Sequence, residues 1–235
     1  MYRIADFNVN IRYMYPENKE FFADYEISDD VKEDYFVAST DREIEMELEA
    51  CLKLDPPQIH SNMYAERLVI LRKLCAMLIE RDTFLLHGVA VEYGGKGYLF
   101  CAPSGTGKST HVMLWQKAFG ADVHIVNGDK PLVRMIDGKF YAYGTPWCGK
   151  EGFNINTRVQ ISAVGFIERA SENLAEKLDE TEAIRRLLSQ IDVSGTADFI
   201  KLFGLAGGIV ESCNAYKLCC NMDVSAANVA YNAMR

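Results

Sequence analysis

The segment from Phe100 to Thr110, FCAPSGTGKST, combines residue types that bind a polyphosphate. Gly105 and Gly107 have no Cβ atom, so the backbone can turn tightly and point several N–H groups at one anion. Lys108 supplies a positive charge for the β and γ phosphates, and the Ser109 hydroxyl is a ligand for a magnesium ion. This Walker A spacing predicts a nucleotide-binding P-loop that consists of Ser104, Gly105, Thr106, Gly107, Lys108, Ser109 and Thr110.

The first position of the pattern holds Ala102, where the usual loop has glycine. That position mainly sets the turn, so alanine fits there if its φ is negative. A phosphate-binding loop also needs a strand before it and a helix after it. The apolar run Tyr98–Cys101 predicts the strand, and Thr110–Phe119 predicts the helix, whose positive end faces the anion. The motif and both flanks favour nucleotide binding over an incidental glycine-rich turn.

Asp129 is the candidate catalytic carboxylate. The short apolar run Val123–Val126 follows the predicted helix and ends in Asn127-Gly128-Asp129. The second strand of a βαβ unit ends beside the phosphates, where a carboxylate serves as a general base or as a magnesium ligand together with Ser109. The alternative interpretation is a turn aspartate that follows Gly128.

His87 is the candidate catalytic histidine. It lies on the strand predicted just before the loop, from where it can orient Asp129 or contact the transferred phosphate. A lone histidine is more often structural, and this alternative stays open. Together with Lys108, these residues make up the predicted catalytic set.

The segment Gly144–Gly152 is long and irregular, and such loops in compact domains are often functional. We expect it to face the acceptor of the reaction. Lys150 and Arg158 are candidates for binding a phosphate or a substrate carboxylate. Trp147 is a candidate wall of the acceptor pocket, and Glu151 is a candidate assisting carboxylate. An ordered loop with solvated charges is the alternative.

The composition and net charge of the chain argue against some classes of binding partner. The chain has 235 residues, 49% of them apolar and 25% charged, and a net charge of −8, which does not favour nucleic acid or an anionic membrane. No apolar run is long enough to span a bilayer, and the N-terminal sequence has no signal-peptide pattern. The seven cysteines are an odd number without a CxxC pair, which favours reduced thiols and a cytoplasmic location.

Residues 1–82 read as an α+β portion that packs on the nucleotide-binding domain, residues 83–235. Alternating apolar residues predict strands at Phe7–Tyr13 and Tyr35–Ala38. Thr40 and Glu43 have the spacing of a capping box and start a predicted helix that ends near Leu52. A second helix is predicted from Asn62 to Glu80, with an apolar stripe of Tyr64, Leu68, Leu71, Cys75 and Leu78.

The second portion reads as an α/β fold with a mixed sheet. Gly94–Gly97 and Asp137-Gly138 predict hairpin turns. The other predicted elements are strands at Phe84–Glu92, Val159–Ile167 and Tyr216–Cys220 and helices at Glu180–Ile191 and Val224–Ala233, the last capped by Asp223.

From Leu86 to Thr110 the sequence LHGVAVEYGGKGYLFCAPSGTGKST resembles the HPr kinase/phosphorylase family and its small relatives, which share a P-loop nucleotide core with the phosphoenolpyruvate carboxykinases. The family has a His-Gly pair, a short glycine turn and then the phosphate loop. It also has two adjacent aspartates after the loop helix, and here Gly128 stands in place of the first. The resemblance covers residues 84–165 well and 214–233 loosely, and it does not cover residues 1–82.

The resemblance implies an ATP-dependent kinase that uses Mg²⁺ to transfer the γ-phosphoryl group to a hydroxyl acceptor, on a small molecule or on a protein or peptide serine. It also implies Asp129 as the base and a possible homo-oligomer. Two alternatives stay open. One is carboxykinase-like phosphoryl transfer to an oxo acid, and the other is a nucleotide-binding regulatory module with little or no transfer, which Gly128 favours.

Overall fold

The computed structural model describes residues 1–193 and 198–235, which form two compact units of mixed α/β structure. The first consists of residues 1–78, and the second of residues 79–193 and 198–235. Within the described residues, no helix has the length and hydrophobicity required to cross a bilayer.

The first unit contains a three-stranded sheet in the order β1 (Tyr2–Ile4), β2 (Phe7–Arg12), β3 (Tyr35–Ala38). The β1–β2 pair is an antiparallel hairpin, and β3 pairs parallel with β2. Ala5 and Asp6 form the hairpin turn with φ of 51° and 65°. The sequence analysis missed β1 because this turn contains no glycine.

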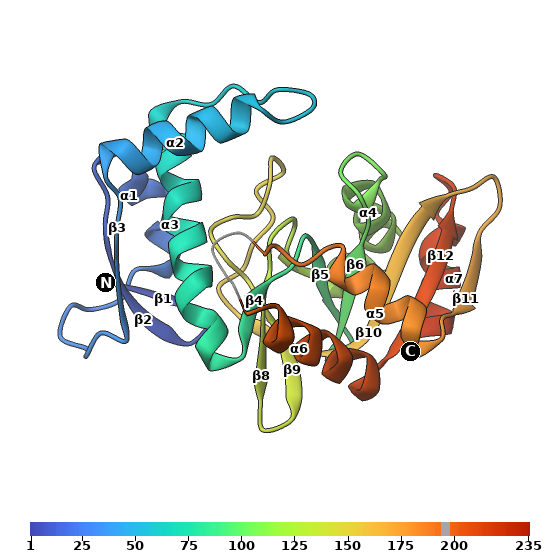
Figure 1. Cartoon of the computed structure of the whole chain (residues 1–235). Coiled ribbons are helices and arrows are strands. Elements are labelled where there is room, and N and C mark those ends of the chain that lie inside the picture. The colour runs from blue at the N-terminus through green and yellow to red at the C-terminus, as the bar shows by residue number, and fades with distance from the viewer. Residues whose placement is uncertain (194–197) are drawn as a thin grey trace. The chain divides into compact units, whose positions relative to one another are not determined.

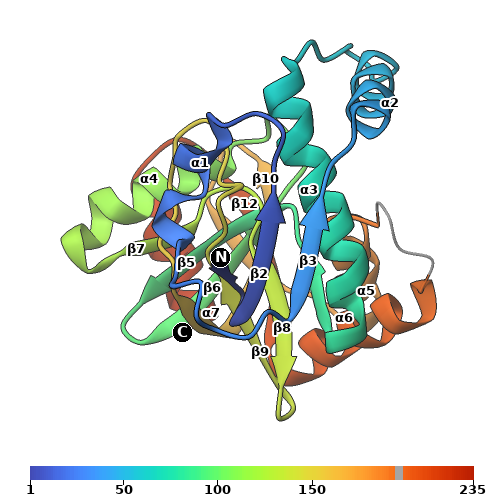
Figure 2. The same ribbon diagram turned by 90° about the vertical axis from the view of Figure 1, so that its left-hand side faces the viewer.

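The helices of the first unit are α1 (Asn18–Phe21), α2 (Asp41–Leu52) and α3 (Asn62–Leu78), which Figure 2 labels together with β2 and β3. The predicted cap of α2 is confirmed, since the Thr40 hydroxyl accepts a hydrogen bond from the Glu43 amide at 3.3 Å. The predicted stripe of α3 is wrong in part. Tyr64 is 38% exposed, whereas Glu66 on the same helix is fully buried. Hydrogen bonds to its carboxylate, described in the Discussion, make that burial tolerable.

The second unit is organised around a nine-stranded mixed sheet (Figure 1). The strands are β4 (Thr83–Leu85), β5 (Gly88–Tyr93), β6 (Lys96–Cys101), β7 (His124–Asn127), β8 (Leu132–Ile136), β9 (Lys139–Tyr143), β10 (Arg158–Arg169), β11 (Leu174–Lys177) and β12 (Asn214–Cys220). The main path runs β4-β8-β9-β10-β6-β5-β7, and β12 pairs with both β10 and β11. The long strand β10 joins the two parts of the sheet, because its beginning pairs with β9 and its later residues pair with β6 and β12.

Helices cover both faces of this sheet. They are α4 (Lys108–Phe119), α5 (Glu180–Leu188), α6 (Phe199–Ser212) and α7 (Ser225–Met234). Alternate residues of β6 point to opposite faces: Tyr98 and Phe100 pack with α4 and α7, and Leu99 and Cys101 pack with α5 and α6. The β6 run is therefore apolar throughout, as expected for a strand buried on both faces.

Two sequence predictions need correction, and two elements of the second unit were not predicted. The predicted strand Phe84–Glu92 is two strands, since β4 pairs with β8 and β5 pairs with β6 and β7. His87 lies in the break between them rather than on a strand. Helix α6 was not predicted because its three glycines resemble a loop, and β11 was also missed.

The strand directions define the edge of the sheet that carries the candidate site. Strands β6, β10 and β12 are mutually parallel, and β7 runs the same way because β5 is antiparallel to both β6 and β7. The carboxyl ends of four strands and the amino end of β5 therefore meet at one edge. Ligands bind α/β sheets at such edges.

Candidate functional site

The glycine turn, residues 102–107, connects the end of β6 to the start of α4. Gly105 and Gly107 have φ of 76° and 126°, values that side chains other than glycine rarely adopt. Gly107 caps α4 without a side-chain hydrogen bond, so the first amides of this 12-residue helix keep their capacity to bind an anion. The strand, turn and helix follow each other as the motif requires.

Arg169, at the carboxyl end of β10, braces this turn. Its Nε donates a hydrogen bond to the Thr106 carbonyl at 3.0 Å, and its Nη2 donates to the Gly105 carbonyl at 2.5 Å. With those carbonyls directed at the guanidinium, the amides of the turn are held in one arrangement. No sequence motif marks Arg169, because 63 residues separate it from Thr106.

Lys108, His87 and Asp129 converge beside the turn. The Lys108 ammonium donates to the Ala102 carbonyl at 2.7 Å and lies 3.2 Å from His87 Nε2. His87 Nε2 is also 3.5 Å from Asp129 Oδ1. The three residues come from the start of α4, from the β4–β5 connection and from the loop after β7, and the sheet edge brings them together.

Burial sets the protonation of His87. It lowers the pKa of His87 below the ordinary value, and the Lys108 charge lowers it further, against the opposing effect of Asp129. At neutral pH the ring is therefore neutral, and its Nε2 lone pair accepts from the Lys108 ammonium. The contact with Asp129 is then not an ion pair. Burial also lowers the pKa of Lys108.

Asn127 and Thr145 fix the position of Asp129. The Asn127 side-chain oxygen accepts from the Asp129 amide at 2.9 Å and from the Lys130 amide at 2.7 Å. Its Nδ2 donates to the Thr145 carbonyl at 3.1 Å, and both side chains are fully buried. Gly88 donates its amide to the Asp129 carbonyl at 2.9 Å. No role was predicted for Asn127 or Thr145, although an asparagine side chain often accepts a hydrogen bond from the backbone amide two residues further on.

The backbone after Trp147 packs against Gly128, the residue that replaces the first aspartate of the resembled family. A Cβ atom at Gly128 would lie 2.9 Å from the Cys148 carbonyl oxygen. A Cβ atom at Gly149, which has φ of 81°, would lie 3.0 Å from Asp129 Cβ. A second aspartate at position 128 therefore does not fit this backbone. The loop takes up that space and lies over Asp129 instead.

The structure separates the four candidate acceptor residues. Trp147 is buried at 5% exposure, and Lys150 and Glu151 are exposed on the loop near Asp129. Arg158 begins β10, eight residues before the Phe166 level that pairs with Cys101, or about 26 Å along the strand. Its Nη1 donates to the Tyr143 hydroxyl at 2.9 Å, and its guanidinium lies 5.1 Å from the Tyr141 ring centre. Arg158 is therefore not brought to the glycine turn.

The donor types at the edge fit magnesium. This ion binds one or two side-chain oxygens together with phosphate oxygens and water. Ser109 offers a hydroxyl on the first turn of α4, and the Asp129 side chain is 30% exposed. Nowhere in residues 1–193 and 198–235 do three or more His, Cys, Asp or Glu side chains group to hold a metal by themselves. This set fits an ion that arrives with a polyphosphate.

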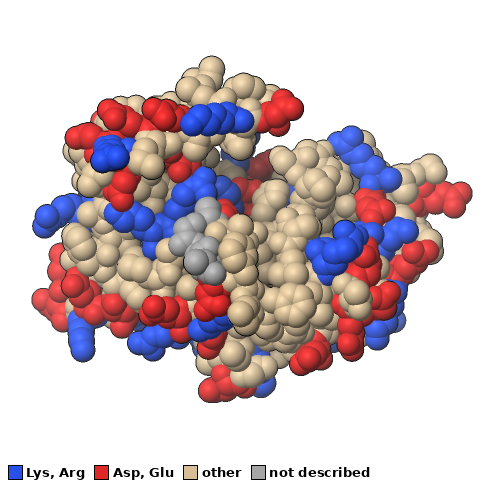
Figure 3. Space-filling model, viewed as in Figure 1, with Lys and Arg blue, Asp and Glu red and all other residues tan. Residues whose placement is uncertain are grey.

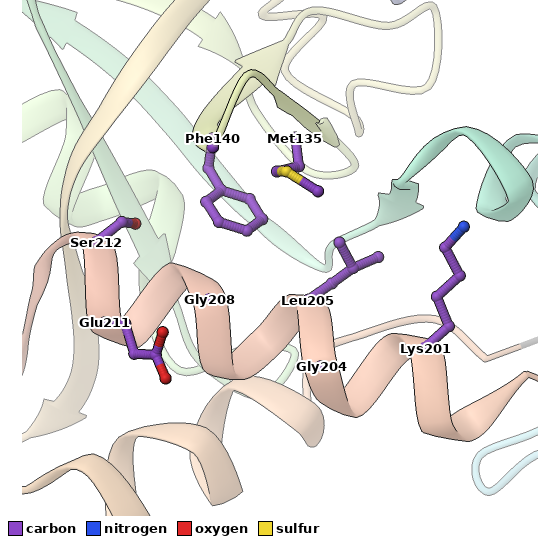
Figure 4. Close-up of a pocket in the computed structure, with 9 residues that line it drawn as sticks. Met135, Phe140, Lys201, Gly204, Leu205, Gly208, Glu211 and Ser212 are labelled. Atoms are coloured by element: carbon purple, nitrogen blue, oxygen red, sulfur yellow. The ribbon is translucent and has the colours of Figure 1, made fainter.

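Two of the cavities among the described residues of the second unit bear on the candidate site. One of about 440 Å³ adjoins the glycine turn and includes Thr106, Gly107 and Arg169 in its lining. The other, of about 510 Å³, lies between α6 and the β8–β9 hairpin, from which Met135 and Phe140 extend toward the helix (Figure 4). The surface over α6 is largely uncharged (Figure 3). Thr106, Gly107 and Thr110 of the predicted P-loop line the smaller cavity, and no P-loop residue lines the larger one, so the smaller cavity adjoins the candidate site.

Comparison with known proteins does not assign the chain to a family. No family model matches the chain, and no curated protein is found as a relative. Among solved structures, the chain is similar to the HPr(Ser) kinase/phosphatase from Coxiella burnetii, with a TM-score of 0.37 and 10% identity over 63% of this chain and 95% of that one. The function proposed below therefore rests on the residues and geometry of the site.

Proposed function

We propose that the chain is an ATP-dependent phosphotransferase that uses Mg²⁺ to transfer the γ-phosphoryl group to a hydroxyl acceptor. The observation that carries this proposal is the convergence of Lys108, His87 and Asp129 beside the glycine turn, with 3.2 Å and 3.5 Å between neighbouring groups. A lysine ammonium and a carboxylate at an anion-binding turn are components that recur in phosphoryl-transfer sites, and the neutral His87 lies between them here.

The turn and Lys108 bind the polyphosphate. The amides of Gly107 and Lys108 contact phosphate oxygens, and the Lys108 ammonium exchanges the Ala102 carbonyl for the β and γ phosphates. Burial lowers the pKa of Lys108, and a bound polyphosphate would stabilise the charged form. Ser109 and Asp129 would hold the magnesium ion, which would neutralise charge on the β and γ phosphates.

Asp129 acts as the base. The acceptor hydroxyl gives its proton to the Asp129 carboxylate, the acceptor oxygen forms a bond to the γ phosphorus, and the bond from that phosphorus to the β–γ bridging oxygen breaks. ADP leaves with the bridging oxygen. Neutral His87 keeps Lys108 directed at the site through Nε2 and does not compete for the proton.

A nucleotide-binding regulatory module is the second candidate. The observation that favours it is Gly128, where no aspartate fits, so a single carboxylate would have to serve both as base and as magnesium ligand. In this function the turn binds nucleotide in the same way, but transfer is slow or absent.

The test measures binding and transfer separately. Titration calorimetry gives the Kd for Mg-ATP, and γ-labelled ATP with pools of sugars, hydroxy amino acids and serine peptides reports transfer. We expect Mg²⁺-dependent label on an acceptor. Asp129→Asn should reduce transfer by about 10³-fold and change the Kd by less than about threefold. Asp122→Asn, an exposed carboxylate after α4, is the matched control and should be active.

The outcomes separate the candidates. Full turnover by Asp129→Asn contradicts the proposed mechanism. Tight ATP binding without transfer to any acceptor pool supports the regulatory module. No uptake of ATP or of inorganic tripolyphosphate contradicts both.

A further inference from the structure

The cavity of about 440 Å³ beside the glycine turn is not accounted for by the catalytic residues. It lies between the first turns of α4 and the carboxyl ends of β10 and β12. Thr106, Gly107 and Thr110 form one end of it, so it begins where the anion-binding amides end. Its volume is in the range of cavities that bind small organic ligands.

The remaining walls suit a flat, mostly apolar group. Ile167 and Ala170 come from the β10 side, and Met222, which is 80% exposed, follows β12. Arg169 is the charged side chain of the lining, and its guanidinium is engaged with the Gly105 and Thr106 carbonyls. The cavity therefore does not offer a second anion site.

His111 gives an independent indication of a ligand. It lines the cavity and is 2% exposed. The Trp115 indole donates to His111 Nε2 at 3.1 Å, which places the ring hydrogen on Nδ1. Within the described residues, Nδ1 has no hydrogen-bond partner. A buried donor without an acceptor is costly, and an acceptor atom on a bound molecule would satisfy it.

We infer that this cavity binds the nucleoside part of the nucleoside triphosphate whose phosphates bind the glycine turn. The inference rests on the proposed function, and it fixes the direction of the ligand. The γ-phosphate lies toward Lys108 and Asp129, the triphosphate follows the turn, and the base and ribose lie between Thr110, Ile167 and Met222. His111 donates to an acceptor atom of this nucleoside.

The test compares Mg-ATP with inorganic tripolyphosphate, which has the phosphates and no nucleoside. We expect wild type to bind ATP about tenfold or more tightly than tripolyphosphate. Ala170→Phe fills the cavity and should remove this preference while tripolyphosphate still binds. Met222→Ala, at an exposed position that should not affect folding, should weaken ATP about threefold and leave tripolyphosphate unchanged. Met113→Ala, exposed on α4 outside the cavity, is the control.

Photolabelling with 8-azido-ATP locates the base directly. We expect the label, mapped by mass spectrometry, on peptides that contain residues 167–170 or 220–222. Equal binding of ATP and tripolyphosphate, or label elsewhere, overturns the nucleoside site and leaves the proposed phosphate site intact. If neither ligand binds, the proposed function fails, and this inference fails with it.

Discussion

Each unit contains a polar cluster around a carboxylate, Glu66 in the first and Asp129 in the second, and these two clusters differ in how completely the carboxylate is hydrogen-bonded. Glu66 in α3 is fully buried and accepts hydrogen bonds from the Met14 amide at 2.6 Å, Asn18 Nδ2 at 2.8 Å and the Ser39 hydroxyl at 2.5 Å. The Asp129 side chain is 30% exposed, and its contact with His87 is 3.5 Å long.

The difference separates a structural carboxylate from a candidate reactive one. Glu66 ties α3 to the β2–α1 connection and to β3, and its lone pairs are occupied. Asp129 is held by its backbone, through Asn127 and Gly88, so its carboxylate stays open to a proton or a metal ion. Changes at the two clusters should therefore affect different properties of the protein.

Gly107→Ala should have the largest effect on ligand binding. Its φ of 126° is outside the regions open to alanine, so the turn must change and the amides lose their arrangement. We expect nucleotide affinity to fall by more than about 100-fold in calorimetry, equivalent to about 2.7 kcal/mol. Gly95→Ala, at the β5–β6 turn with φ of 77°, is the matched control. If both variants bind like wild type, the glycine turn does not hold the ligand.

Glu66→Gln should have the largest effect on stability. The amide replaces one acceptor oxygen with an NH₂ group that faces buried donors, which costs about 2–4 kcal/mol of unfolding free energy in urea titrations. Nucleotide affinity should not change in the folded protein. Glu45→Gln, exposed on α2, should unfold like wild type. A stable Glu66→Gln variant would show that the cluster tolerates an unpaired donor.

Arg169→Gln should weaken nucleotide binding by about tenfold, because the glutamine loses the bidentate brace on the turn. Arg169→Lys keeps the charge but can satisfy one carbonyl, so we expect an intermediate loss of about threefold. Unfolding in urea should change little for either variant, since the side chain is exposed. If the lysine variant binds as tightly as wild type, charge alone accounts for the effect of Arg169.

The sequence predicts the elements of the fold that depend on local signals and misses those that depend on long-range packing. Local sequence patterns correctly predicted β3, α2 and the Asp137-Gly138 hairpin, because each of these elements is determined by residues that are close together in the sequence. Helix α6 escaped prediction because Gly208 reads as a loop residue, although a Cβ there would lie 2.9 Å from the Phe140 ring, which packs against the helix. Long-range packing decides such positions.

The residues of the candidate site also fall into two groups, those that local sequence patterns mark and those that they do not. Lys108 and Asp129 were identified because a motif and a strand end mark them, and the structure places them on either side of His87. Their catalytic roles stay predictions. Arg169 and Thr145 were missed, since each acts through contacts with residues distant in sequence. Spacing alone reveals neither contact.

Lowering the pH should reduce the unfolding free energy through His87 in the second unit, by less than the Glu66→Gln substitution does. The pKa of His87 is lowered first by burial and then by the Lys108 charge, so the unfolded chain takes up a proton near pH 6.5 and the folded chain only at lower pH. The unfolding free energy contributed by His87 is therefore intact above pH 6.5 and falls as the pH drops below it. Between pH 7 and pH 5.5 the loss is at most about 1 kcal/mol, reduced by solvent at a side chain that is 33% exposed.

His111 contributes to the same loss, because burial lowers its pKa to about 4. His87→Gln should therefore remove only part of the slope of unfolding free energy against pH, measured by urea titration at each pH. His124→Gln, 55% exposed on β7, is the control and should keep the full slope. Bound Mg-ATP adds the sharper comparison. In the proposed mechanism Lys108 exchanges only the Ala102 carbonyl and stays beside His87, so the part of the slope that depends on His87 should persist with ATP bound. A smaller His87 contribution would mean that Lys108 leaves His87 for the phosphates.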